Sequence, residues 1–161
     1  MATDSARHWL LKAGLSISLM LVLLPVMAQR QLGQDDQPTL NQQEVAFLDS
    51  LLNVQQQYLL QLRAQNEPVT LQETVDLSNK RVAFATGSLG TSLLTKSAFF
   101  RNNILPWTEK GEVPVVNTIA LSPAERTASG GYDVVILVWT KAFPKASRRK
   151  VLAQLAAQSS R

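Results

Sequence analysis

The chain has 161 residues, of which 45% are hydrophobic and 17% charged, with a formal net charge of +4 and no cysteine. This composition fits one folded domain with an additional segment and is too apolar for a disordered chain. The lack of cysteine excludes disulfides, thiol chemistry and zinc sites built on thiolates. The single histidine, His8, lies in the N-terminal segment described next. We therefore predict a protein that is not an enzyme and binds no metal or cofactor.

Residues 1–28 have the three parts of a secretory signal peptide. Two basic residues precede the charge-free apolar run Ala13–Leu24, and small or modest side chains lead up to a cleavage position after Ala28. The alternative is an uncleaved anchor, because Trp9–Ala28 is long enough to span a bilayer. Both alternatives export the rest of the chain. We expect a periplasmic protein, either soluble after cleavage or anchored in the inner membrane.

Charge is unevenly distributed over the exported part. Gln29–Asn79 contains two basic and seven acidic residues, a net charge of −5, whereas Lys80–Arg161 contains 12 basic and four acidic residues, a net charge of +8. This asymmetry predicts either two functional surfaces or two segments that attract each other within one fold.

Residues 29–38 are polar and without periodicity, which predicts a flexible tether. A long amphipathic helix is expected over residues 39–66, beginning with Thr39 as N-cap and Gln42 as its capping-box partner. Its apolar residues recur at helical spacing. This stripe consists of Val45, Leu48, Leu52, Leu59 and Leu62.

The stripe has two interpretations. The spacing from Val45 to Leu62 continues an a/d register in which Gln55 is the one polar position, so the helix could form a short coiled coil with a partner or a second copy. Alternatively, the stripe covers the chain's own sheet, as amphipathic helices of small domains usually do. We favour the second interpretation and keep the stripe as the candidate partner-binding surface.

Residues 67–161 are expected to form a small α+β domain. Strands are predicted at 80–86, 113–121 and 132–140, an irregular strand or extended arm at 69–77, helices at 89–102 and from Pro144, turns around 102–112 and a polar loop at 122–131. Because Val134–Trp139 is wholly apolar, its strand is expected at the centre of the sheet, covered on both faces. The fold class is therefore α+β, with a small mixed β-sheet of about three or four strands packed by helices.

The turn from Gly87 to Lys96 follows a predicted strand and enters a predicted helix, which is the setting of a phosphate-binding loop. Thr95 replaces the glycine that such a loop needs before its lysine, so nucleotide hydrolysis is not favoured. What remains is a weak anion-binding site at a helix N-terminus. Its candidate residues are Ser88, Gly90, Thr91 and Lys96.

The last predicted helix carries the densest basic cluster, formed by Lys145, Arg148, Arg149 and Lys150. This cluster is a second candidate for partner binding, on an anionic membrane surface or an acidic protein surface. Nucleic acid is disfavoured, because only Phe143 is close enough to stack on a base.

These observations favour an exported interaction or assembly protein, an accessory component of a cell-envelope machine such as a secretion or conjugation apparatus. Its partners would be other envelope proteins or a second copy of the long helix. The alternative function is a periplasmic protein that binds a small anion at the Gly87–Lys96 turn.

Overall fold

The computed structural model describes residues 31–69, 71–87, 91–110, 114–139 and 157. The predicted signal or anchor segment and the predicted basic helix lie outside the described residues, as do Ser88 and Gly90. Within the described ranges, no helix combines the length and the apolar character needed to cross a membrane.

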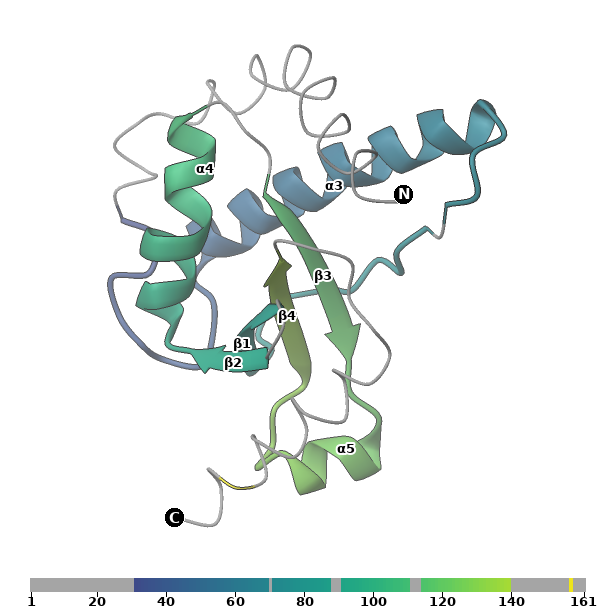
Figure 1. Cartoon of the computed structure of the whole chain (residues 1–161). Coiled ribbons are helices and arrows are strands. Elements are labelled where there is room, and N and C mark those ends of the chain that lie inside the picture. The colour runs from purple at the N-terminus through teal and green to yellow at the C-terminus, as the bar shows by residue number, and fades with distance from the viewer. Residues whose placement is uncertain (1–30, 70, 88–90, 111–113, 140–156, 158–161) are drawn as a thin grey trace.

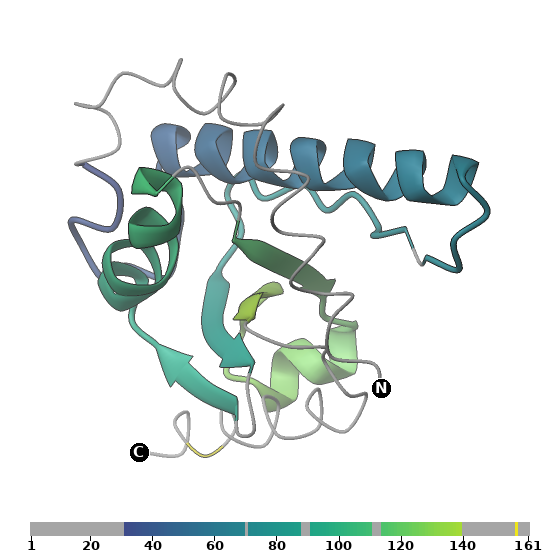
Figure 2. The same ribbon diagram turned by 45° about the horizontal axis from the view of Figure 1, so that its top comes forward.

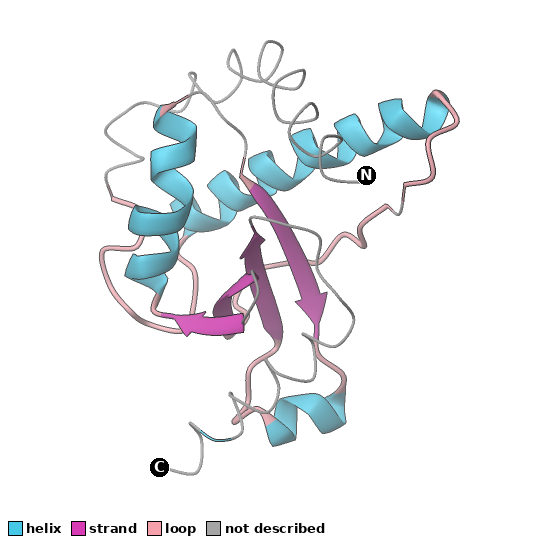
Figure 3. Cartoon of the chain, viewed as in Figure 1, coloured by secondary structure: helices cyan, strands magenta, loops and turns pink. Residues whose placement is uncertain are grey.

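The described chain is an α+β fold built on a four-stranded mixed sheet (Figures 1 and 3). The strands are β1 (Val82–Gly87), β2 (Thr91–Leu94), β3 (Val115–Ala120) and β4 (Val134–Trp139), in the spatial order β2-β1-β4-β3. The β1–β4 pair is parallel, and the two outer pairs are antiparallel. The prediction that 132–140 forms a central strand is confirmed.

Helices cover one face of this sheet (Figures 1 and 2). The long helix α3 (Gln42–Ala64) crosses it, and a second helix runs beside α3 through the π-helical segment η1 (Ala98–Ile104) and the short α4 (Leu105–Glu109). Three aromatic rings join these elements, since the Phe99 ring centroid lies 4.8 Å from that of Phe84 and 5.2 Å from that of Phe100. The main hydrophobic core therefore lies between the helices and the sheet.

The central strand β4 contributes side chains to both faces. Val134, Ile136 and Val138 belong to the core under the helices, whereas Val135 and Leu137 belong to a second buried cluster with Ala83 and Ala85 of β1. Successive side chains of a strand point to opposite faces. A strand buried on both faces needs an uninterrupted apolar sequence, which is the pattern that predicted its position.

The start of α3 differs from the prediction. The N-cap is Asn41, whose side chain accepts a hydrogen bond from the Glu44 N–H, while the Glu44 carboxylate accepts one from the Asn41 N–H. The expected pair was Thr39 and Gln42. Thr39 instead forms an isolated β-bridge with Arg81, and this extended conformation keeps it out of the helix. A Glu at the third helical position also makes a stronger, charge-assisted cap than a Gln.

The N-terminal residues 31–41, here called the strap, pack on the fold rather than forming the expected flexible tether. Leu32 is only 2% exposed and lies in the main core, and the Val82 N–H donates to the Pro38 carbonyl at 2.6 Å. The prediction was wrong here because it followed the polar composition of the segment. One apolar side chain and a few hydrogen bonds are enough to fix it.

Three other local predictions are corrected. Leu93 and Leu94 lie in strand β2, where they pair with β1 in a hairpin, and not in a helix. Residues 102–109 continue the helix instead of turning, since Pro106 tolerates the first turn of α4. The expected polar loop at 122–131 contains the helix α5 (Pro123–Ala128), which has a Ser122–Glu125 capping box. The 69–77 segment is extended but forms no strand among the residues described.

Gln55 closes the outer edge of the sheet. Its side-chain amide donates to the Val116 carbonyl at 2.8 Å and accepts from the Val116 N–H at 3.1 Å, so it pairs with the edge strand β3 as another strand would. Gln72, on the segment that follows α3, donates a further bond to the same carbonyl. Gln55 is 3% exposed. The polar position in the apolar stripe therefore has an intramolecular partner.

Replacing Gln55 by Leu is expected to lower the free energy of unfolding by about 1–3 kcal/mol, because the buried Val116 N–H loses its partner. Gln57→Leu on the exposed side of the same helix is the matched control and should change stability by less than about 0.5 kcal/mol. Urea unfolding followed by circular dichroism measures both. Equal stability of the two variants would show that the amide bridge contributes nothing.

Candidate functional site

Helix α3 extends past the sheet, and its C-terminal part is the candidate interaction surface (Figure 2). Gln55 is the last residue of α3 that is fully buried. In residues 56–64, here called the distal half of α3, Tyr58, Leu59 and Leu62 are half-buried, and Leu60 is 41% exposed. An apolar helix segment that leaves the core it belongs to is a surface suited to another protein.

The segment after α3 turns back alongside the distal half (Figures 1 and 2). Asn66 makes the reversal with φ 62°, a left-handed conformation that asparagine tolerates. The Gln72 N–H then donates to the Gln56 side-chain oxygen. Burial, together with the nearby carboxylate of Glu67, raises the pKa of Tyr58. The returning segment thus supports the helix and adds an acidic group to its surface.

The structure divides the predicted stripe between the core and this surface. Leu48 is fully buried, and Val45 and Leu52 are half-buried against the main core. Leu59 and Leu62 lie in the distal half, outside that core cluster. The first part of the stripe thus covers the chain's own sheet, as favoured above, and only its second part is available to a partner. The basic cluster from Lys145 to Lys150 lies outside the described residues.

Lys96 forms a buried ionic cluster with two carboxylates. Its ammonium lies 2.6 Å from Asp35 Oδ1 and 3.1 Å from Glu44 Oε2, and it donates a hydrogen bond of 3.0 Å to the Thr39 carbonyl. A lysine ammonium has three N–H donors, so these acceptors use all of them. Lys96 is 2% exposed and Glu44 0%. We call this cluster the Lys96 clamp.

The clamp joins three separate parts of the chain. Glu44 belongs to the first turn of α3, and its Oε1 accepts from the Gly33 N–H of the strap. Asp36, also in the strap, accepts from the Ser97 N–H at the start of the helix that continues into η1. The hydrogen bond from the Lys96 ammonium lowers the pKa of Asp35, and that from the Ser97 N–H lowers the pKa of Asp36. The charged side chains here hold the strap to two helices.

This arrangement does not favour the predicted anion site. The cation that was to hold the anion, Lys96, already faces two carboxylates. The segment expected to supply helix N-terminal amides begins as strand β2 at Thr91. A pocket of about 290 Å³ does lie beside the clamp, between residues 36–38 and the β1–β2 hairpin. Its polar lining includes Asp36, whose negative charge opposes an anion.

Sequence reasoning missed the clamp, although part of it left a signal. The spacing of Asn41 and Glu44 is a capping-box pattern and identifies the true start of α3. The pairing of Glu44 with Lys96 joins residues that are far apart in the sequence, so no local pattern reveals it. Among the described residues, no group of three or more His, Cys, Asp or Glu side chains is placed to hold a metal ion.

Comparison with known protein families gives one match, over residues 36–157, about three quarters of the chain. The chain belongs to the family described as Domain of unknown function (DUF8192). The matched region begins in the strap and includes all of α3 and the sheet. Neither the curated proteins nor the solved structures contain a significant match.

Replacing Lys96 by Met is expected to destabilise the fold by about 3–5 kcal/mol, because the buried Glu44 carboxylate keeps its charge but loses its cation. The double variant Lys96→Met with Glu44→Gln should recover part of this loss. Lys110→Met, at an exposed lysine, is the control. Chemical unfolding of the four chains gives the coupling energy. Strictly additive effects would mean that Glu44 and Lys96 do not interact.

The pKa of Asp35 also makes stability depend on pH. Because the folded state lowers this pKa below the usual 3.8, Asp35 stabilises the fold above that value, and the contribution is lost as the pH falls through the folded-state pKa. Wild type is therefore expected to be more stable than Asp35→Asn at neutral pH, with the difference vanishing in acid. A difference that does not change with pH would contradict the assignment. Unfolding curves recorded over the acidic range test this.

Proposed function

We propose that the chain is an exported, non-enzymatic interaction or assembly protein, an accessory component of a cell-envelope machine such as a secretion or conjugation apparatus. It contacts its partner through the distal half of α3. The observation that carries this proposal is the helix that continues beyond its own core while keeping apolar side chains on its surface. The predicted signal or anchor segment supports export, and the cell-envelope context follows from export.

The use of the charged side chains agrees with a binding role. Lys96, Glu44 and Asp35 hold the strap in place, and Glu125 caps α5. The buried amide of Gln55 satisfies an edge strand. Each of these groups has a structural task in positioning α3 or the sheet. No specific observation favours the alternative of small-anion binding, because its proposed cation is engaged in the clamp.

The distal half offers a partner an apolar contact with an acidic border. Leu59, Leu60 and Leu62 supply the apolar area, and Glu67 lies near Tyr58 on the returning segment. A helix or loop of another envelope protein with apolar residues and a flanking basic residue would complement it. In this arrangement the proximal part of α3 serves as the base that holds the distal half rigid.

Photo-crosslinking in the living cell tests this function. A photoreactive amino acid at Leu60 is expected to give a specific adduct, whereas the same amino acid at Asn53 is expected to give none. The two exposed positions are seven residues apart, so they share one side of the helix and differ only in distance from the core. Protease added to spheroplasts should digest the adduct if the chain is exported.

The substitution Leu59→Asp is expected to abolish the adduct at Leu60 without unfolding the domain, whereas Leu48→Asp should unfold it because Leu48 is in the core. Circular dichroism of the purified variants separates the two effects. Equal adducts at Asn53 and Leu60, or none at either position, would overturn the assignment of the surface. An adduct protected from external protease in spheroplasts would overturn export.

A further inference from the structure

The strap enters the fold at a fixed point. Leu32 is in the core, and the Gly33 N–H is bonded to Glu44 at 2.9 Å. Gly33 also has φ +64° and lies so close to the second helix that a side-chain carbon there would be 3.1 Å from Ser97 Cα and Phe100 Cβ. The chain before residue 31 must therefore leave the domain beside the N-terminal ends of α3 and η1.

The sequence before this point leaves little slack. The predicted membrane segment ends at Ala28, four residues before Leu32. Four extended residues span at most about 14 Å. If the segment stays in the membrane as an anchor, which is one of the two alternatives in the proposed function, a core residue is held within that distance of the bilayer. The domain must then lie directly on the lipid surface.

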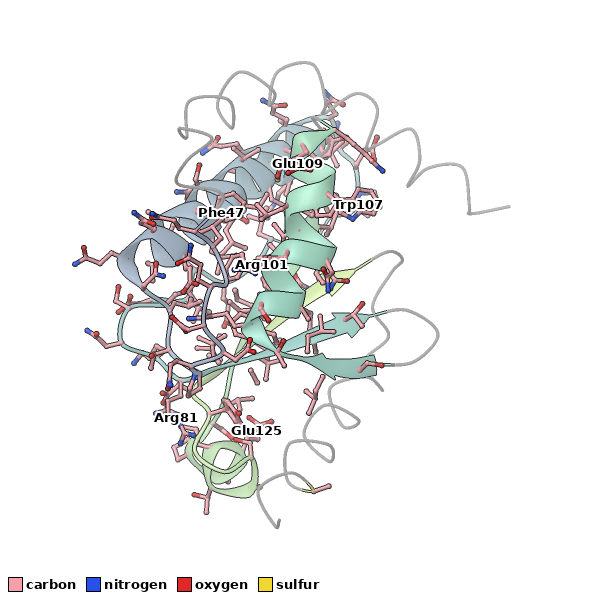
Figure 4. The ribbon with its side chains drawn as sticks, turned by 90° about the vertical axis from the view of Figure 1, so that its left-hand side faces the viewer. Phe47, Arg81, Arg101, Trp107, Glu109 and Glu125 are labelled. Carbon is pink, nitrogen blue, oxygen red and sulfur yellow. The ribbon has the colours of Figure 1, made fainter. Side chains whose placement is uncertain are left out.

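The elements around the entry point decide which side faces the lipid. Helix α3 starts there and runs away for about 33 Å, at 1.5 Å per residue over its 23 residues. The helix from Ala98 to Glu109 stays at the entry end (Figures 1 and 4). In Figure 4, Trp107 stands on the side of this helix that points away from α3. It is half-exposed, and Arg101 and Lys110 are exposed.

We propose that the strap holds the domain on the bilayer with the exposed side of the Ala98–Glu109 helix against anionic lipid headgroups, and with the distal half of α3 pointing away. Trp107 supplies a side chain that favours the membrane–water interface, and Arg101 and Lys110 supply cations for anionic headgroups. The partner-binding surface of α3 is thereby presented to the periplasm, about one helix length from the membrane.

The absence of cysteine from the whole chain allows a direct test with single-cysteine variants. The full chain, with Asn102→Cys or Gln61→Cys, is labelled with a fluorophore and reconstituted into phosphatidylcholine–phosphatidylglycerol vesicles that contain spin-labelled headgroups. Both side chains are exposed, one on η1 and one on the distal half of α3. Circular dichroism confirms that each variant is folded. A third pair carries a Gly/Ser insertion between Ala28 and Gln29.

The proposal predicts that the chain floats with the vesicles and that the label at 102 is quenched severalfold more strongly than the label at 61. The insertion should reduce this difference, because a longer tether no longer presses the domain on the lipid. Flotation with equal quenching, or with stronger quenching at 61, overturns the orientation but leaves the anchor intact. Quenching unchanged by the insertion overturns the tether as its cause. A chain that does not float overturns the anchor and this inference together.

Discussion

One buried ammonium holds the N-terminal half of this protein together. Lys96 has almost no contact with solvent, and its acceptors come from the strap and the first turn of α3. Burying a charge is costly unless it is paired and fully hydrogen-bonded, and here each N–H has a partner. Glu44 extends the arrangement, because the same carboxylate caps α3 and accepts the Gly33 N–H. The position and direction of α3 follow from this cluster.

The long helix then has two parts with different tasks. Its proximal part supplies Phe47, Leu48 and Leu51 to the core and ends in Gln55, whose amide closes the edge of β3. Beyond Gln55 the same apolar periodicity continues where no sheet lies beneath it, supported only by the returning segment. A helix needs its packed face for stability in water, so the distal half depends on the proximal half. Fixed at one end and exposed at the other, α3 suits the presentation of a binding surface at a distance.

Sequence patterns predicted the elements whose residues repeat regularly. The apolar run of β4, the alternation in β3 and the helical spacing in α3 each identified the right element, and the mixed sheet follows from their order. Errors arose where one long-range contact outweighs local composition. Leu32 is a single apolar residue in a polar segment, and Leu93 and Leu94 have helical spacing but pair with β1. The candidate surface was predicted in part, since the stripe was recognised but not the point at which it leaves the core. The Glu44–Lys96 pair has no local signature at all.

The docked strap is the central claim, and hydrogen–deuterium exchange of the native protein, read residue by residue, tests it most directly. The Gly33 N–H, bonded to Glu44, and the Val82 N–H, bonded to Pro38, should exchange as slowly as the core amides of Phe47 and Leu48. Protection of this order at residue 33 would show that the strap opens only when the domain unfolds. Exchange of the Gly33 N–H at the rate of an unstructured peptide, with α3 still protected, would contradict the account.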